Sequence, residues 1–307
     1  MRGGVSEEEV FGPAEYHADP DAPRVVILEN KVVNVQDREG LELEAEELDD
    51  GVRAELVVKE GFELDEPVHF CVGIPWEEGV QRIETRVVVE PEARIRLLSH
   101  CSFPRAEDVL HEMKAEFVVK DGAELEVQDI HYHGEGGVRL RAEYDVEVGE
   151  GARLSSEFRL TKGRVGELWW VSRGVVRREG SLEGVVRIMA REDDKVDIEE
   201  SVRLVGEDSR AVLDSRAAAI DGARVRFVGE LSGEAPGAKG HVECSEIIRG
   251  DGRVESVPKL KVVDPDARLT HEAALGTLER REIEALMSRG LSEEEAVEML
   301  VEAMLRG

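Results

Sequence analysis

Three short pieces of sequence decide the fold: EARI at residues 92–95, GAEL at 122–125 and GARL at 151–154. Each piece begins a run in which apolar and charged residues alternate, which is the pattern of a half-buried β-strand. The three pieces recur at a nearly constant interval, as the coils of a solenoid do. A glycine or acidic residue followed by alanine suits a tight corner between two strands, because small side chains fit there.

The same alternation extends from about residue 25 to residue 260. Further copies of the corner sequence occur less regularly, at residues 209–213, 222–227 and 266–269. No convincing long helix interrupts this span. The pattern predicts a mainly β protein, with a parallel β-helix over residues 35–265 and an arm of residues 1–34 that contains one short helix. A β-sandwich explains the alternation equally well.

Composition narrows the function. The chain has 307 residues, 41% of them hydrophobic, and a formal net charge of −29. Such an acidic chain would be repelled by phosphate backbones, so we expect no nucleic-acid partner. No apolar run approaches the length of a membrane span, and the N-terminus lacks a basic-then-apolar signal. We therefore expect a cytoplasmic protein without a membrane partner.

Cysteine is sparse. Cys71, Cys101 and Cys244 lie far apart, and no C-x-x-C pair occurs. This argues against a disulfide framework and against a self-contained zinc or ferredoxin-type site. The sequence also lacks a G-x-x-x-x-G-K-[ST] phosphate loop and a G-x-S-x-G elbow, so any ATP chemistry would have to come from a partner.

Cys244, His271 and Glu272 form the first candidate site. A thiolate is a good ligand for iron and a good acceptor of sulfur. A lone cysteine can equally be a small core residue. Adjacent strand residues such as His271 and Glu272 point to opposite faces. They can share a metal only if the backbone bends or the site lies between two subunits; the alternative is a capped turn with one exposed acid.

Cys101, His111, His131 and His133 form the second candidate site. His131 and His133 share one face of a predicted strand, and residues one coil away in a β-helix lie close enough to join them. One cysteine and three histidines could hold a transition metal. A polar ladder or a set of solvent-facing histidines is an equal alternative. Cys71 is interpreted as a core residue.

Residues 266–307 are predicted to form a small helical segment. Gly290 ends a first helix, and Ser292 with Glu295 forms a capping box for a second. The apolar face of the first helix is predicted to contain Leu278, Ile283, Leu286 and Met287. The second is predicted to bury Ala296, Met299, Leu300, Ala303 and Met304. This leaves Leu291, Val297 and Val301 for a second surface that could contact a partner.

Four pieces of the same region resemble a known family. They are CSEIIRG at 244–250, SVPKLKV at 256–262, HEAALG at 271–276 and SRGLSEEEA at 288–296. Their order and spacing resemble the C-terminal signature of the SufB/SufD family, the scaffold proteins of the SUF iron–sulfur cluster assembly system. The resemblance implies a right-handed parallel β-helix and favours that fold over the sandwich. The chain looks like the short archaeal form of the family.

The resemblance also implies a function. SufB members have a cysteine at the place of Cys244, and the H-E-A form at His271 is of the SufB type. It implies that Cys244, His271 and Glu272 contribute to a transient iron–sulfur cluster near a subunit interface. The implied partners are a second copy or a SufD-like chain, a SufC-type ATPase on the C-terminal helices, and recipient apo iron–sulfur proteins. The chain would then be a scaffold and not an enzyme. A β-helix enzyme acting on acidic polysaccharide and a structural binding module are the rival hypotheses.

Overall fold

The computed structural model describes residues 21–306, which form two facing β-sheets and two C-terminal helices. The short helix expected in the N-terminal arm lies outside these residues. Sheet A has ten strands: β1 Arg24–Leu28, β2 Lys31–Gln36, β5 Val68–Gly73, β7 Arg94–Phe103, β9 Glu124–His133, β11 Arg153–Lys162, β13 Ser181–Arg191, β15 Arg210–Asp221, β17 Lys239–Gly250 and β19 Arg268–Thr277. Sheet B has nine: β3 Leu41–Glu47, β4 Val52–Val58, β6 Glu78–Val89, β8 Asp108–Val119, β10 Val138–Val148, β12 Gly166–Val176, β14 Lys195–Leu204, β16 Arg224–Gly233 and β18 Arg253–Val262.

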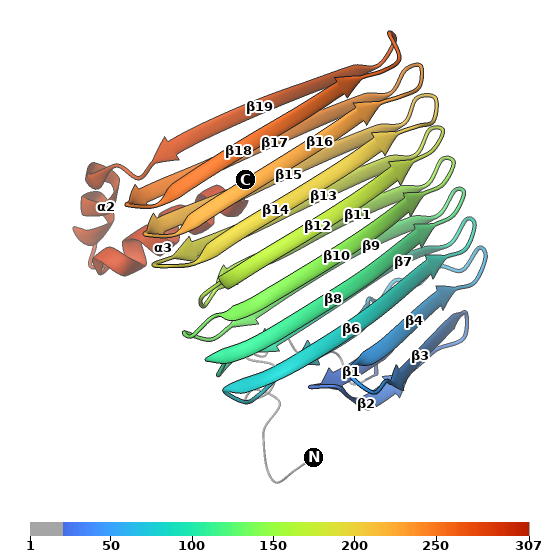
Figure 1. Cartoon of the computed structure of the whole chain (residues 1–307), viewed down its shortest axis with the longest axis horizontal. Helices are drawn as coiled ribbons and strands as arrows, with labels where there is room; N and C mark the ends of the chain where they lie inside the picture. The colour runs from blue at the N-terminus through green and yellow to red at the C-terminus, as the bar shows by residue number, and fades with distance from the viewer. Residues whose placement is uncertain (1–20, 307) are drawn as a thin grey trace.

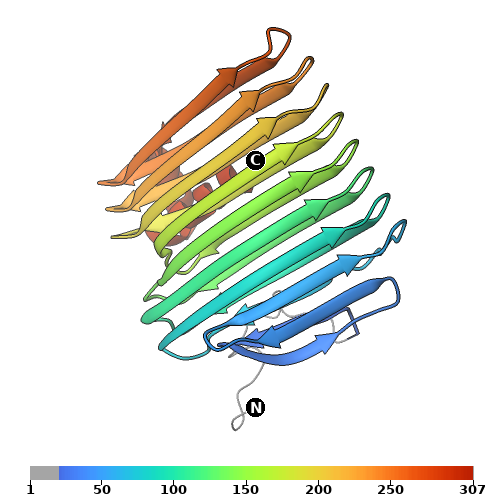
Figure 2. The same ribbon diagram turned by 45° about the vertical axis from the view of Figure 1, so that its right-hand side comes forward.

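From β4 onward, successive strands alternate between the two sheets, and each strand pairs in parallel with the strand two places along the chain. Figures 1 and 2 show the resulting stack of coils, which rises from the N-terminal to the C-terminal end. This arrangement confirms the predicted mainly β parallel β-helix. A sandwich of the rival type would have antiparallel neighbours within each sheet.

The corners follow from the repeated sequence pieces. Ala93, Ala123 and Ala152 are fully buried at the turns where the chain passes from sheet B to sheet A. The residue before each alanine takes a left-handed backbone conformation, with φ of 59° at Glu92 and 69° at Gly122. Glycine adopts this conformation without strain, and a single non-glycine residue can adopt it in a turn. The alanine side chain then fills the inside of the corner.

The two ends of the solenoid differ. At the N-terminal end β2 pairs with β1, and β3 with β4, in antiparallel fashion. At the C-terminal end β18 and β19 are the last strands of their sheets, and most of their residues are exposed or half-buried. The strands run from Arg24 to Thr277, so they extend beyond the expected range of residues 35–265 on both sides. At the N-terminal side the extra strands are β1 and β2, which pair with each other as a hairpin, and at the C-terminal side the extra strand is β19, which pairs with β17.

The interior is filled by alternate residues of both sheets, which form one continuous apolar core along the stack. Outside, arginine and glutamate pair between coils. Arg86 contacts Glu55 on one neighbouring coil at 2.6 Å and Glu116 on the other at 2.9 Å. Such exposed pairs contribute little individually.

Helices α2 (Arg280–Met287) and α3 (Glu293–Arg306) are connected by a short turn. The capping box is confirmed: the Glu295 amide donates to Ser292 Oγ (3.2 Å), and the Ser292 amide donates to Glu295 Oε2 (2.7 Å). Gly290, with φ of 103°, lies in the turn after α2. Within residues 21–306, no helix has both the length and the apolar character needed to cross a membrane.

The buried face of α3 differs from the predicted one. Ala296, Val297, Val301 and Leu305 pack with Ile283 of α2 against Met189, Ala218 and Ile220 of β13 and β15. Met299 is 50% exposed and Ala303 is also exposed. The prediction that Met299 and Ala303 are buried is therefore wrong, as is the idea that Val297 and Val301 are free for a partner. Helix α3 has apolar residues on two sides, and the apolar patch on sheet A selects the side that contains the valines.

Candidate functional site

Cys244 lies on β17, on the side of sheet A that faces the interior. Val242, Cys244 and Glu246 alternate with exposed or half-buried residues, and all three are buried. The next coil, β19, places His271 opposite Val242 and Ala273 opposite Cys244. Cys244 and His271 are therefore diagonal neighbours on the same side of sheet A.

Glu272 takes the opposite side. It pairs with Glu243, whose side chain is on the outer face, and both His271 and Glu272 are exposed. The pairing of β19 with β17 is regular from Arg268 to Thr277, so no bulge turns Glu272 toward Cys244. Of the two conditions under which His271 and Glu272 could share a metal, a backbone bend is not met within this chain.

Cys244 has acidic surroundings. Burial, and then the charge of Glu246, raise the pKa of its thiol to about 12. Ser256 of β18 donates a short hydrogen bond to Glu246, and burial raises the pKa of Glu246 as well. In the isolated chain Cys244 is therefore a neutral thiol at neutral pH, and a cation must displace its proton before the sulfur can act as a ligand.

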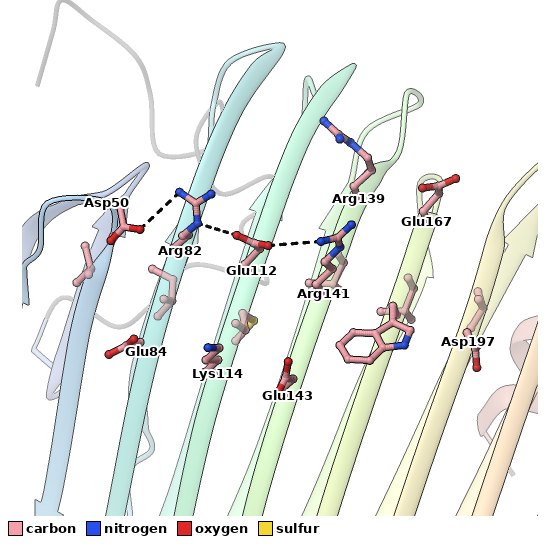
Figure 3. Close-up of a pocket in the computed structure, with 18 of the residues that line it drawn as sticks. Asp50, Arg82, Glu84, Glu112, Lys114, Arg139, Arg141, Glu143, Glu167 and Asp197 are labelled. Carbon is pink, nitrogen blue, oxygen red and sulfur yellow. Dashed lines mark hydrogen bonds and ion pairs between the residues drawn. The ribbon is translucent and has the colours of Figure 1, made fainter.

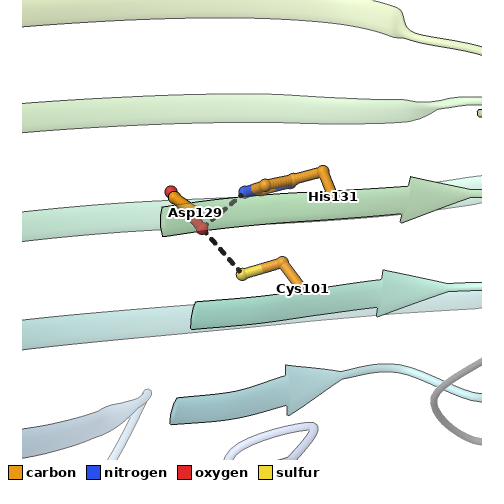
Figure 4. Close-up of side chains that lie close together, drawn as sticks. All are labelled: Cys101, Asp129 and His131. Atoms are coloured by element: carbon orange, nitrogen blue, oxygen red, sulfur yellow. Dashed lines mark hydrogen bonds and ion pairs between the residues drawn. The ribbon is translucent and has the colours of Figure 1, made fainter. Parts of the chain in front are cut away.

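The second candidate group lies in the middle coils, where β7 places Cys101 directly opposite His131 of β9. Asp129 precedes His131 on the same interior side (Figure 4). Cys101 Sγ lies 4.0 Å from Asp129 Oδ1, and His131 Nε2 lies 3.3 Å from the same oxygen. All three side chains are buried, and their ligand atoms lie within 4.8 Å of one another. This is the one such group of His, Cys, Asp or Glu found within residues 21–306.

His133 and His111 lie beside this group. His133 Nε2 is 3.4 Å from His131 Nδ1, and His133 Nδ1 is 3.1 Å from the Arg164 carbonyl oxygen. The His111 ring, on β8 of the opposite sheet, has its centroid 6.2 Å from that of His131. The structure therefore brings together all four predicted residues, with His133 behind His131 and His111 across the interior.

The buried environment controls ionisation here. Burial, and then Asp129, raise the pKa of the Cys101 thiol well above its usual range. Burial lowers the pKa of His111 strongly and that of His133 to about 3, so both rings are neutral. Burial opposes ionisation of Asp129, but His131, Tyr144 and Ser99 together outweigh it and lower the pKa of that carboxyl.

Several polar residues of the interior were not identified from the sequence. Asp129 was missed although it lies two residues before His131 on a predicted strand, so period two alone would have placed it on the same face. Glu246 was also missed, although it lies two residues after Cys244 on the same face of its strand.

Glu200 was missed as well. It lines a small cavity of about 30 Å³ that is also lined by Asp129 and Tyr144. Burial raises the pKa of Glu200 to about 7.

A broad hollow lies on the outer face of sheet B, and many of the residues that line it are charged (Figure 3). Its charges pair with one another across the coils: Arg82 contacts Glu112 at 2.7 Å and Asp50 at 4.0 Å, and Arg141 contacts Glu112 at 3.8 Å. A polysaccharide-processing enzyme would use carboxylates and cations along such a face. Here Arg82, Glu112 and Arg141 form a ladder of ion pairs, like those on the rest of the surface.

Comparison with known proteins gives a consistent result. The family model described as "SUF system FeS cluster assembly, SufBD core domain" matches residues 75–304. An iron-sulfur cluster assembly SufBD family protein of Methanocaldococcus jannaschii is 36% identical over 284 residues, which cover 92% of this chain and 90% of the relative. A SufBD family protein of Pyrococcus horikoshii is 34% identical over 281 residues, covering 92% and 86%. The iron-sulfur cluster assembly protein SufB of Bacillus subtilis is 22% identical over 253 residues, covering 80% and 53%.

Proposed function

Because this chain belongs to the SufBD family of iron–sulfur cluster assembly proteins, we propose that it is the scaffold on which a cluster is built. In this proposal Cys244 is the principal ligand or sulfur acceptor, and His271 with Glu272 completes the site. The observation that carries the proposal is the position of Cys244 and His271: they lie on the same side of β17 and β19, and β19 is the last strand of sheet A at the C-terminal end of the solenoid.

The chemistry of the three groups suits temporary binding. Iron and sulfide favour a thiolate, whereas imidazole and carboxylate are weaker and more exchangeable ligands. Iron would displace the proton of the Cys244 thiol, and the neighbouring Glu246 carboxyl would favour the incoming cation. A site with one thiolate and exposed partners can pass its cluster on to a recipient apo iron–sulfur protein, because it does not saturate the iron with cysteine.

The open end also supports dimer formation. Strands β18 and β19 each have one unpaired edge. Large apolar side chains are exposed there: Val262 at the end of β18 and Val263 after it are each 54% exposed, and Leu275 of β19 is 64% exposed. Such edges favour pairing with a second chain, and a two-fold contact is the commonest arrangement. We propose a homodimer, or a heterodimer with a SufD-like chain, through the last coils. A site between two subunits would remove the difficulty that His271 and Glu272 of one chain point to opposite sides.

The C-terminal helices are the proposed contact for a SufC-type ATPase. Since Val297 and Val301 pack on the solenoid, the surface available to such a partner is the opposite one, which contains Met299 and, on α2, Met287. Both methionines are exposed, at 50% and 40%. Met287→Asp and Met299→Asp should therefore abolish copurification with the ATPase while leaving the helices folded. Unchanged complex formation by the double variant would contradict this part of the proposal.

Anaerobic reconstitution with iron and sulfide tests the scaffold function. The wild-type chain should develop the visible absorbance of an iron–sulfur cluster, and Cys244→Ser should lose most of it. His271→Ala should lose a smaller but clear part. Cys71→Ser is the matched control, because Cys71 is an equally buried cysteine on the same sheet. If Cys244→Ser reconstitutes normally and Cys101→Ser does not, the assembly site is the Cys101 group instead.

A further inference from the structure

We propose that Cys101, Asp129 and His131 bind one divalent transition-metal ion, Zn²⁺ or Fe²⁺, inside the middle coils, as a site separate from the one that builds the cluster. The proposal does not depend on the scaffold function, because it concerns a single ion held within one chain. It starts from three buried ligand atoms that lie within 4.8 Å of one another.

The spacing fits a metal. Tetrahedral ligands about 2.0 to 2.3 Å from a zinc ion lie roughly 3.3 to 3.8 Å from one another. His131 Nε2 and Asp129 Oδ1 are 3.3 Å apart, and Cys101 Sγ is 4.0 Å from the same oxygen. The strand register fixes this arrangement, because Cys101 and His131 are direct partners on β7 and β9 and Asp129 is two residues earlier on β9. An ion at the centre needs only small side-chain movements.

The hydrogen bonds fix which nitrogen of His131 faces the proposed site. His133 Nδ1 lies 3.1 Å from one backbone carbonyl oxygen and 3.3 Å from another, so that nitrogen carries the proton and His133 Nε2 is an acceptor. His131 Nδ1 therefore donates to His133 Nε2 at 3.4 Å. His131 Nε2 is then the ring nitrogen that faces Asp129 Oδ1, at 3.3 Å.

His131 Nε2 and Asp129 Oδ1 face each other at this point. His131 Nε2 forms no aligned hydrogen bond within the part of the chain that the structure describes. The second oxygen of Asp129 is already occupied, because the Tyr144 hydroxyl donates to Oδ2 at 2.7 Å. A metal ion placed between His131 Nε2 and Asp129 Oδ1 would be bound by both atoms, and the ion would take the place of any proton held there. The outer hydrogen bonds from His133 and Tyr144 are the kind that orient metal ligands.

The charge balance points to a divalent ion. A carboxylate, a thiolate and a neutral imidazole sum to two negative charges, which one divalent cation neutralises. A neutral complex can be buried at far lower cost than isolated charges. The mixed sulfur, nitrogen and oxygen set favours Zn²⁺ or Fe²⁺ over Mg²⁺ and Ca²⁺, which prefer oxygen. His111 is a candidate fourth ligand, since neither of its ring nitrogens has a hydrogen-bond partner within residues 21–306.

Metal analysis tests the proposal directly. The full chain, produced anaerobically with added zinc or iron and passed through chelator under native conditions, should keep about one ion per chain. Cys101→Ser and Asp129→Asn should retain less than a tenth of that amount. Cys71→Ser and Cys244→Ser are controls that should keep the ion. No stoichiometric metal in the wild type, or full retention by Cys101→Ser, would overturn the proposal.

Cobalt substitution gives a second readout that does not require a variant of the three proposed ligands to fold. Reconstitution of the wild-type chain with Co²⁺ alone should give thiolate-to-cobalt charge transfer and the intense visible bands of a tetrahedral site. Cys244→Ser should show the same spectrum, which separates this ion from the proposed cluster site. Absence of the charge-transfer band from Cys244→Ser, with the band present in the wild type, would assign the metal to the C-terminal end and refute the inner site.

Discussion

Cys101 with His131 and Cys244 with His271 are two versions of one arrangement at different levels of the same stack. In both, a cysteine lies on one strand of sheet A and a histidine follows on the next coil, on the interior side. In the middle of the stack further coils cover the pair from both sides. At the end of the stack no further coil follows β19, so His271 is exposed.

This difference in covering has chemical consequences. The middle pair is supplemented from its own chain by Asp129, and its hydrogen bonds are largely internal. Cys244 and His271 at the end of the stack have no such third ligand from their own chain, because Glu272 lies on the outer side of sheet A. A closed site of the first kind suits an ion that stays, and an open site of the second kind suits a cargo that is built and released.

The largest expected difference between the two sites is in metal exchange. If protein reconstituted with iron and sulfide is treated with a chelator under native conditions, iron at the end coil should be lost faster than the inner ion by orders of magnitude. The reason is that release from the middle coils requires local unfolding of the stack. Time-resolved metal analysis measures both rates, and equal rates would remove the basis of the comparison.

The two thiols should also differ in reactivity, by about tenfold or more. In metal-free single-cysteine variants, Cys244 should react with a small alkylating agent faster than Cys101, because the last coils open more readily. Its rate should rise about tenfold per pH unit, since the thiolate is the nucleophile and the pKa of Cys244 is about 12. Mass spectrometry of the labelled chain gives both rates. Faster labelling of Cys101 would show that the middle coils are the more open ones.

The solenoid and the grouping of the middle site could largely be predicted from the sequence. The repeated corner pieces predicted a solenoid, because each alanine occupies a corner that only a small side chain fits. They did not exclude a β-sandwich, because the alternation of apolar and charged residues shows which face of a strand is buried but does not show which strands pair with each other. The four predicted residues of the middle group do lie together. Asp129 was not identified because the sequence contains so many acidic residues. Its position two residues before His131 nevertheless predicts that both side chains lie on the same face of the strand.

The helices show where sequence reasoning fails. Helix α3 has apolar residues on more than one side, so periodicity could not decide which side is buried. The decision comes from Met189, Ala218 and Ile220, an apolar patch on the outer face of sheet A. Those residues lie far away in sequence. Only the packing of the helix on that patch shows that Val301 is buried and Met299 is exposed.

Glu200 lies in the interior and provides a smaller, energetic test. Its pKa of about 7 in the folded chain exceeds the ordinary 4.5, so the folded chain holds this proton more tightly than the unfolded chain. The resulting stability is fully present below pH 4.5 and is lost as the pH rises to about 7, a loss of about 3 kcal/mol. Glu200→Gln should therefore be more stable than the wild type by about that amount at pH 8, and similar to it at pH 4.5.

Denaturant unfolding at the two pH values measures the Glu200 effect. Glu246→Gln is a useful comparison nearer the open end, where burial also raises the pKa of the carboxyl. A smaller gain at Glu246 is expected, because Ser256 donates a hydrogen bond that favours its charged form. A loss of stability in Glu200→Gln at pH 8 would mean that the charged carboxylate has a partner in the interior.

The smallest effect tests whether the helices and the open end form one unit. Ser292→Ala removes the hydroxyl that accepts the Glu295 amide at 3.2 Å and donates to Glu295 Oε2 at 2.8 Å. Loss of such a cap costs about 1 kcal/mol, which corresponds to roughly fivefold faster hydrogen exchange in α3. The apolar face of the helix packs on β13 and β15, and Glu293 of α3 contacts Arg249 of β17 through an ion pair of 2.5 Å. Amides of β19, and of β17 away from Arg249, should therefore keep their rates. If β17 and β19 also exchange faster, α3 stabilises the open end through the sheet. A partner that binds the helices could then change how exposed Cys244 and His271 are without touching either residue.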